Sequence, residues 1–410
     1  MVRTRAQRRR LAGGSDALTL PLPTRARTRW TAQQVATIAT GGPDRLPVLT
    51  PADIVPIDPL HDFWDMWQIA RVDGSTVVIG GRSYWFFLAT PRFDDPESRH
   101  DAARIYLTSH GADGWRLHGP AFADNFTPGS REWSGSAVLA GDGITLTMYF
   151  TAAGRRDGQH SFEQRLFETV GRFTVEGDAA RTDRWSPPVE SVVADGRCYH
   201  IADEAVAPPT GIRGFRDPGF FHDPATGQDH LLFTGSAAWN DGQHNGIIGI
   251  ASRDHADAMW RLAPPVIDSI GVNSELERPH IVLRDGRYYL FWSTQAKRFA
   301  AGLTAPTGLY AMVADGMDGP WRPVNGSGLV AGNPAAEPTQ AYCWWVTGDG
   351  QVLSFVDYAG LEGADPAANV TLRRARFGGT AAPFFRLDFA GDRVAIRTTG
   401  SAAPDRPPSP

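Results

Sequence analysis

The sequence DGRYYLFW at residues 285–292 gives the strongest indication of the fold. Its Asp-Gly pair is a turn signal, and the aromatic and aliphatic residues that follow are types enriched in buried β-strands. Residues 142–150 (DGITLTMYF) repeat the arrangement, with apolar and polar side chains in alternation. The Gly-Gly pair at residues 80–81, between strand-like runs at 76–79 and 84–88, predicts a β-hairpin.

Strand-like runs recur along the chain, whereas helical periodicity is scarce and is best at residues 32–38. Further runs of strand character are residues 230–233, 247–250, 309–312 and 352–356. Loose repetition of short strands fits a β-propeller, in which four-stranded sheets repeat around an axis. A large β-sandwich would leave a similar pattern. The residues alone therefore predict an all-β fold and leave these two architectures open.

The 410-residue chain is 42% hydrophobic and 21% charged, an ordinary composition for a globular protein. No flexible linker interrupts it, so we expect one domain over residues 29–400, between a disordered basic arm (1–28) and a disordered Pro-rich tail (401–410). A net charge of -5 gives no reason to expect nucleic acid as a partner, and no apolar run is long enough to span a membrane. Since no secretory signal is recognisable, we expect a cytoplasmic protein or one exported by a non-classical route.

The two cysteines, Cys198 and Cys343, are too few for a disulfide framework and lack the spacing of metal ligands. We expect two buried thiols, although a fold that brought them together could pair them. No Gly-rich loop opens a helix, which argues against a phosphate or nucleotide site.

Three short motifs each place a carboxylate beside an Arg or a Trp: FWDMW (63–67), FRDP (215–218) and ELERP (275–279). Cleaving a sugar acetal requires one carboxylate that attacks or stabilises positive charge and a second carboxyl that protonates the leaving oxygen. Aromatic faces and arginines suit the apolar face and the hydroxyls of a sugar. Each motif alone can be explained as a turn or an exposed strand edge. Together they indicate an enzyme that acts on carbohydrate.

In this order, the motifs resemble those of glycoside hydrolase family 68, which comprises levansucrases, inulosucrases and related bacterial β-fructofuranosidases. The resemblance includes WSGS (133–136), GSGLV (326–330) and QAY (340–342) and covers roughly residues 29 to 395. It implies a five-bladed β-propeller with a funnel-shaped active site at its centre. It also implies sucrose as the substrate, a fructosyl-enzyme intermediate, and transfer of fructose to water or to a sugar acceptor with retained configuration.

The resemblance further implies three catalytic roles. Asp65 would be the nucleophile, Asp217 the stabiliser of the transition state, and Glu277 the general acid/base. The residues that would bind substrate are Trp64, Trp133, Ser134, Arg216, Glu275, Arg278, Gln295 and Tyr342. Among these, the serine is expected near the nucleophile, and the tyrosine in the nucleophile or acid/base network.

The spacing of the third motif predicts its local geometry. Glu275 and Glu277 are two residues apart, so on an extended segment both side chains point to one face. Arg278 would point to the other face, and placing it in the pocket requires a bend, which we expect at Pro279.

The chain departs from the family at two places. Many calcium-binding members carry an aspartate where this chain has Ser274, and an upstream acidic ligand is also missing near Gly211. We therefore predict no calcium and expect no metal or cofactor, although Asp and Glu residues elsewhere could assemble a different site. Gln295 is uncharged where polymer-forming relatives often carry Arg or His, which favours hydrolysis and short oligosaccharides over long polymers.

Two alternatives remain. A related five-bladed glycosidase acting on fructans or arabinans also uses two aspartates and a glutamate, although the Trp-rich strings favour the sucrose-acting family. A non-catalytic sugar-binding propeller would not need a paired nucleophile and acid. The oligomeric state is not predicted.

Overall fold

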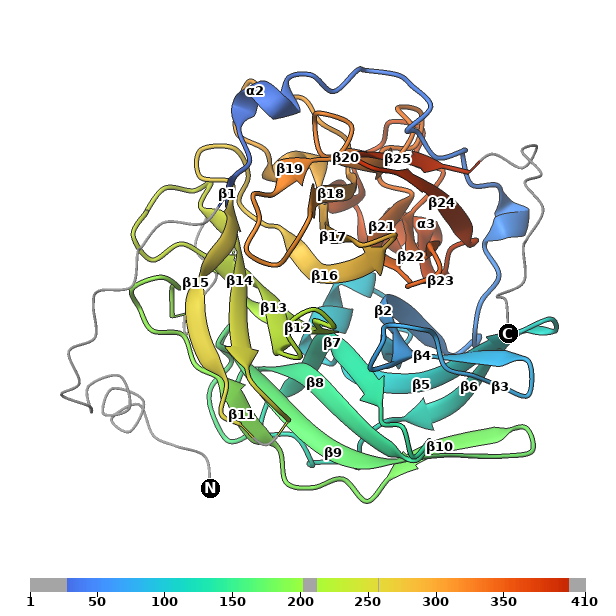
Figure 1. The fold of residues 1–410 in the computed structure, drawn as a ribbon. Coiled ribbons are helices and arrows are strands. Elements are labelled where there is room, and N and C mark those ends of the chain that lie inside the picture. Colours follow the sequence, from blue (N-terminus) through green and yellow to red (C-terminus); the bar gives the residue numbers. More distant parts are fainter. Residues whose placement is uncertain (1–27, 202–211, 257, 398–410) are drawn as a thin grey trace.

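The computed structural model describes residues 28–201, 212–256 and 258–397, and over these ranges the chain is almost entirely β-structure. Five blades surround a central axis, and in Figure 1 the colours pass once around that axis from blue to red. The predicted all-β class and five-bladed propeller are confirmed. Apart from Thr28, the predicted arm and tail lie outside the described residues.

The first half of the chain forms blades 1 and 2. Blade 1 contains, from the axis outward, β2 (His61–Arg71), β4 (Arg82–Pro91), β5 (Arg104–Gly111) and β6 (Gly114–Pro120), with β3 (Val78–Ile79) beside β4. Blade 2 contains β7 (Arg131–Leu139), β8 (Thr145–Ala153), β9 (Gln164–Glu176) and β10 (Ala179–Asp183), with β11 (Val189–Val192) beside β9. The two blades join at the axis, because β2 and β7 pair in parallel with Ile69 opposite Ala137.

The second half forms blades 3 to 5. Blade 3 contains β12 (Phe215–His222), β13 (Asp229–Ser236), β14 (Gly246–Arg253) and β15 (Arg261–Asp268), with β1 (Thr28–Arg29) parallel to β15. Blade 4 contains β16 (Glu277–Arg284), β17 (Arg287–Thr294) and β18 (Gly308–Ala314), with β19 (Arg322–Pro323) and β20 (Leu329–Gly332) both paired to β18. Blade 5 contains β21 (Ala341–Val346), β22 (Gln351–Tyr358), β24 (Phe385–Ala390) and β25 (Arg393–Ile396), with β23 (Phe377–Ala381) beside β22. The first strand of each blade contacts the first strand of its neighbours, so β2, β7, β12, β16 and β21 form the inner ring.

Two turn pairs singled out in the sequence close hairpins. Gly80 and Gly81, with φ of 59° and 76°, connect β3 to β4, and Asp285 and Gly286, with φ of 50° and 74°, connect β16 to β17. Positive φ at both central residues is the property of type I′ turns, whose twist matches that of the strands they join. The sequence DGRYYLFW thus begins in a turn and continues as β17, as predicted.

The helices are short and lie on the periphery. The α-helix α2 covers only Ala32–Val35, where residues 32–38 were predicted; Thr31 and Gln34 cap its start, and the β-branched Thr37 and Ile38 lower the helical propensity beyond it. The helix α3 (Val370–Arg376), whose first turn is capped by Asn369, was not predicted. The 3₁₀ turns are η1 (Pro51–Asp53), η2 (Pro96–Asp101), η3 (Ala296–Arg298) and η4 (Pro366–Ala368).

The segment that precedes blade 1 forms hydrogen bonds with blades 4 and 5. The buried Trp30 donates from Nε1 to the carbonyl of Ser327 in blade 4, at 2.9 Å. Gln340, at the start of blade 5, accepts from the Leu49 amide and donates to the Pro47 carbonyl, both at 2.9 Å. The start of the described chain therefore bridges the blades that follow it in sequence without a covalent bond.

Cys198 and Cys343 are both buried, as expected from the sequence. Within the described ranges, no helix combines the length and hydropathy needed to cross a membrane.

Candidate active site

All five inner strands are interrupted by a β-bulge at the same level of the propeller. The pairing register shifts between Trp64 and Met66, Trp133 and Gly135, Arg216 and Gly219, Glu277 and His280, and Tyr342 and Trp345. A bulge leaves one or two residues unpaired and re-aims their side chains. We call one residue from each bulge, taken together, the bulge ring: Asp65, Ser134, Asp217, Arg278 and Cys343.

Backbone strain marks four members of the bulge ring. The φ angle is 36° at Asp65, 62° at Asp217, 55° at Arg278 and 54° at Cys343. For a residue with a Cβ, this left-handed conformation costs about 1 kcal/mol or more, and such strain is concentrated at functional sites. The bend expected at Pro279 is instead made by the arginine itself, because its own positive φ breaks the strand alternation.

Asp217 is held rigidly by the residues around it and is only 6% exposed. The Ser134 hydroxyl donates to Oδ1 at 2.8 Å, and the Thr234 hydroxyl donates to Oδ2 at 2.9 Å. Its backbone amide donates to the Thr151 hydroxyl at 2.9 Å, and Arg216 Nε lies 3.6 Å from Oδ2. Both carboxylate oxygens are therefore fixed in direction, as a group that stabilises charge without moving should be.

Three of these contacts were not expected from the sequence. Ser134 was expected near the nucleophile, but its hydroxyl bonds Asp217, because the bulge in β7 turns it toward blade 3. Thr151 and Thr234 were not predicted at all. Each lies on the second strand of its blade, and nothing in the local sequence distinguishes it from other strand threonines.

Asp65 is less tightly held, and its side chain is 19% exposed. Arg278 Nη1 lies 4.0 Å from its Oδ2. Burial raises the pKa of Asp65, and the nearby Asp217 adds to this, whereas the Arg278 charge and the Cys343 thiol lower it. A carboxylate with few hydrogen bonds and an exposed edge is available to attack a ligand.

Glu277 shares a guanidinium with Glu275. Arg216 Nη2 lies 2.8 Å from Glu277 Oε1 and 3.4 Å from Glu275 Oε1, so both glutamates face the same side as predicted. Arg298 Nε contacts the other oxygen of Glu275 at 2.8 Å. Burial and the neighbouring Glu275 charge raise the pKa of Glu277 to about 7, against the opposing effect of Arg216. A carboxyl group that titrates near neutral pH can both give and take a proton.

Tyr342 completes the surroundings of this carboxyl group. Its hydroxyl donates to Glu277 Oε2, which puts the tyrosine in the acid/base network that the resemblance implied. Gln295 directly follows β17, ahead of η3, and is partly exposed. Its part in binding an acceptor stays a prediction.

Two buried tryptophans, Trp64 and Trp133, both contact His100. Trp64 precedes Asp65 on β2 and packs edge-on against His100, with ring centroids 6.0 Å apart. Trp133 on β7 donates from Nε1 to the His100 carbonyl at 3.4 Å. The guanidinium of Arg99 lies 5.7 Å from the Trp64 ring centroid. These contacts fix the two indoles, which a sugar-stacking platform requires.

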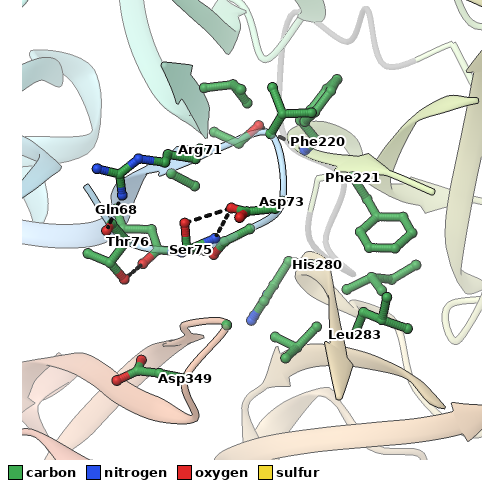
Figure 2. A pocket seen from close by; sticks show the side chains of 18 of the residues that line it. Gln68, Arg71, Asp73, Ser75, Thr76, Phe220, Phe221, His280, Leu283 and Asp349 are labelled. Atoms are coloured by element: carbon green, nitrogen blue, oxygen red, sulfur yellow. Dashed lines mark hydrogen bonds between the residues drawn. The ribbon is translucent and has the colours of Figure 1, made fainter. Parts of the chain in front are cut away.

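A separate cavity of about 790 Å³ opens at the opposite ends of the inner strands. In Figure 2, Asp73 accepts hydrogen bonds from Ser75, and Thr76 is bonded to Gln68, so these polar groups are paired with one another. None of the three predicted catalytic carboxyl groups is among the described residues that line it. The three predicted catalytic carboxyl groups lie instead on or beside the bulge ring.

Comparison with known proteins gives consistent matches over nearly the whole chain. The family model described as Levansucrase/Invertase matches residues 22–246 and 244–401. A levansucrase of Pseudomonas savastanoi pv. glycinea is 30% identical over 411 aligned residues, which cover 90% of this chain and 90% of that protein. A levansucrase of Zymomonas mobilis is 33% identical over 358 aligned residues, with 80% and 81% covered.

Solved structures show the same fold. An inulosucrase from Halalkalicoccus jeotgali bound to kestose superposes with a TM-score of 0.83 at 35% identity, covering 93% of this chain and 100% of that one. The levansucrase from Gluconacetobacter diazotrophicus gives a TM-score of 0.76 at 24% identity, with 94% of each chain covered. At that lower identity, the likeness supports the fold alone.

Proposed function

Because this chain belongs to the levansucrase/invertase family, glycoside hydrolase family 68, and is thus an enzyme of glycoside hydrolase or fructosyltransferase type, we propose that it cleaves sucrose by a retaining mechanism. The observation that carries the proposal is that Asp65, Asp217 and Glu277 meet on or beside the bulge ring in three different environments. Environment, rather than residue type, assigns roles to carboxyl groups in one site.

In the first step, the proton on Glu277 passes to the glycosidic oxygen while a carboxylate oxygen of Asp65 attacks C2 of the fructosyl unit. The bond between C2 and the glycosidic oxygen breaks, its electron pair stays on that oxygen, and glucose leaves. Asp217, with both oxygens fixed, stabilises the positive charge that develops on the sugar ring.

In the second step, Glu277 acts as a base. It takes a proton from water or from an acceptor hydroxyl, whose oxygen attacks C2 and displaces the Asp65 carboxylate. The two displacements each invert the configuration, so the product retains it. A group with a pKa of about 7 can serve in both directions near neutral pH, which is what the raised pKa of Glu277 provides.

The surrounding residues support binding of a fructosyl unit. Trp64, which precedes Asp65 on β2, and Trp133 supply aromatic side chains, and Arg216, which bridges Glu275 and Glu277, supplies positive charge beside the carboxyl groups. We propose that the uncharged Gln295 holds acceptor sugars weakly, so that water and short acceptors are favoured over a growing polymer.

The experiment that tests the proposal is incubation with concentrated sucrose, followed by quantification of glucose, free fructose and oligosaccharides. Glucose release supports sucrose as the donor, and an excess of glucose over fructose measures transfer. Asp65→Ala and Asp217→Ala are each expected to lower glucose release at least about 10³-fold. Asp73→Ala, which changes a carboxylate in the other cavity, is the matched control and should retain the rate. Absence of glucose, together with hydrolysis of a fructan or an arabinan, would reject sucrose as the donor.

A further inference from the structure

The second strands of blades 2, 3 and 4 each place a hydroxyl group at the same register position. The residue that pairs with the last residue before the bulge is Thr151 in blade 2, Thr234 in blade 3 and Ser293 in blade 4. All three side chains are fully buried. In blades 1 and 5 the same position holds Leu88 and Phe355, which have no hydroxyl group. The hydroxyl groups therefore follow a geometric repeat that is limited to three consecutive blades.

Each of these hydroxyl groups accepts a hydrogen bond from a backbone amide in the bulge of the next blade. The pairs are the Asp217 amide with Thr151 at 2.9 Å, the Arg278 amide with Thr234 at 3.2 Å, and the Trp344 amide with Ser293 at 3.0 Å. Asp217 and Arg278 have positive φ, and so has the residue before Trp344. Because a buried amide needs an acceptor, and a strained backbone persists only where its surroundings hold it, these bonds fix one bulge against the next.

Thr234 differs from the other two because its hydroxyl group also contacts the side chain of a proposed catalytic residue. The hydroxyl donates to Asp217 Oδ2 at 2.9 Å, whereas the Thr151 hydroxyl donates to the Ser134 carbonyl at 3.1 Å. A backbone amide can only donate, so the Thr234 oxygen accepts from Arg278 and its proton is directed to the carboxylate. Both hydrogen bonds use one oxygen atom, and a side chain without a hydroxyl group can make neither.

The peptide group that Thr234 holds is the one that joins Glu277 to Arg278. The Arg278 amide also donates to Asp217 Oδ2 at 3.4 Å, so the hydroxyl, the carboxylate and the amide form a closed triangle. A shift of this peptide would move Glu277 relative to the Asp217 carboxylate, and a misplacement of about 1 Å can lower a rate about 100-fold.

We propose that Thr234 is a positioning residue, whose hydroxyl group fixes the Asp217 carboxylate relative to the peptide that carries Glu277. The threonine acts through these two residues and has no contact with the sugar in this role. The inference rests on the proposed function, because it assumes that Asp217 and Glu277 act on the same sugar.

The position of the hydroxyl groups around the axis fits the different demands on the three carboxyl groups. In the proposed mechanism, Asp217 and Glu277 must keep their separation in both steps, whereas Asp65 forms and breaks a bond to C2. The bulge of Asp65 follows blade 5, where Phe355 occupies the register position and offers no hydroxyl group. The hydroxyl pattern therefore fixes the stabiliser and the acid/base to one another and leaves the nucleophile outside it.

Thr234→Val and Thr234→Ser test the role, because the first removes the hydroxyl group and the second keeps it. Thr234→Val is expected to lower kcat for glucose release about 10- to 100-fold with KM within about threefold, the range for loss of one hydrogen bond to a charged group. Thr234→Ser should keep kcat within about threefold of the parent, because both hydrogen bonds can still form.

Thr108→Val is the matched control, because it removes another fully buried strand hydroxyl, which donates to the Trp85 carbonyl in blade 1 at 3.2 Å. It should lower Tm to a similar extent as Thr234→Val and leave kcat within about twofold of the parent, since a loss of stability alone does not change the turnover of the folded enzyme.

Hydrogen exchange at the Arg278 amide tests the contact without sucrose. Thr234→Val should speed exchange of this amide at least about tenfold, whereas Thr234→Ser and Thr108→Val should leave it near the parent rate. If Thr234→Val does not fold, Thr234→Ala removes the same hydroxyl group without adding an apolar atom and carries the same expectations.

An unchanged exchange rate at Arg278 would overturn the inference. So would a kcat that stays within about threefold of the parent in Thr234→Val, or an equal loss of kcat in Thr234→Val and Thr234→Ser. If the parent protein releases no glucose from sucrose, the proposed function fails, and exchange at Arg278 still decides whether the hydroxyl group holds this peptide.

Discussion

Glu277→Gln should inactivate the protein and yet stabilise it at neutral pH. Burial and the Glu275 charge raise the pKa of Glu277 from 4.5 to about 7, a difference of about 2.5 units. At about 1.36 kcal/mol per unit, the ionised carboxyl group costs the folded state up to about 3.4 kcal/mol. Gln has one acceptor oxygen, whereas Arg216 and Tyr342 each use a different oxygen of the carboxyl group, so we expect about 1 kcal/mol of this gain to be lost. The net gain is about 2 kcal/mol.

The pKa shift of Glu277 determines how the stability difference between Glu277→Gln and the parent changes with pH. Because the folded-state pKa is raised, the folded protein binds more protons than the unfolded chain between pH about 4.5 and about 7, and the free energy of unfolding falls as pH rises through that window. The Glu277→Gln variant does not show this fall in the free energy of unfolding. The stability difference between variant and parent should therefore be least below pH 4.5 and reach its maximum above pH 7.

Calorimetric melting at pH 4.5 and pH 8 measures the effect. A gain of about 2 kcal/mol corresponds to a rise in Tm of about 2 to 4 °C at pH 8, with a smaller difference at pH 4.5. The rate of glucose release should fall at least about 10³-fold. Glu176→Gln changes an exposed glutamate and is the matched control for charge. A Tm difference that is the same at both pH values, or a variant less stable at pH 8, would refute the argument from burial.

Three further outcomes are expected. Arg216→Lys should lower kcat about 100-fold with little change in Tm, because an ammonium group cannot bridge Glu275 and Glu277 as the guanidinium does; a rate within a few-fold of the parent would contradict this. Tyr342→Phe should lower the rate about tenfold and move the alkaline limb of the pH–rate profile upward, since the ionised Glu277 loses a hydrogen bond; a downward shift would contradict it. Treatment with a chelator should leave activity and Tm unchanged, because the described residues contain no cluster of three or more His, Cys, Asp or Glu side chains able to hold a metal ion, and a marked fall in either would show a metal site.

Much of the architecture was predictable because its determinants are local. The turn pairs at residues 80–81 and 285–286 dictate type I′ hairpins through glycine's access to positive φ, and the aromatic runs after them form strands. The short helix α3 was missed because only one capping residue and seven helical residues mark it. The helix α2 was predicted to reach residue 38 but ends at Val35, because hydrophobic periodicity does not show where helical propensity becomes too low.

The three candidate carboxyl groups were likewise readable from short motifs, since an acidic residue beside Arg or Trp is visible in the chain itself. The directions and hydrogen-bond partners of the side chains around them could not be read from the sequence. A bend that aims Arg278 was expected at Pro279, but the positive φ lies at Arg278 itself, within a bulge that depends on the partner strand. Ser134 was expected near Asp65, and its hydrogen bond to Asp217 was not foreseen, because that partner is set by the packing of blade 2 against blade 3.

By itself, the sequence determined the all-β class, the strand-forming segments and the three acidic residues, because each depends on residue types within a few positions of one another. The tertiary structure decided which oxygen each donor reaches, the raised pKa of Glu277, and the place of Arg278 beside Asp65. These depend on burial and on side chains supplied by five different blades, and such contacts exist only once the ring of strands has closed.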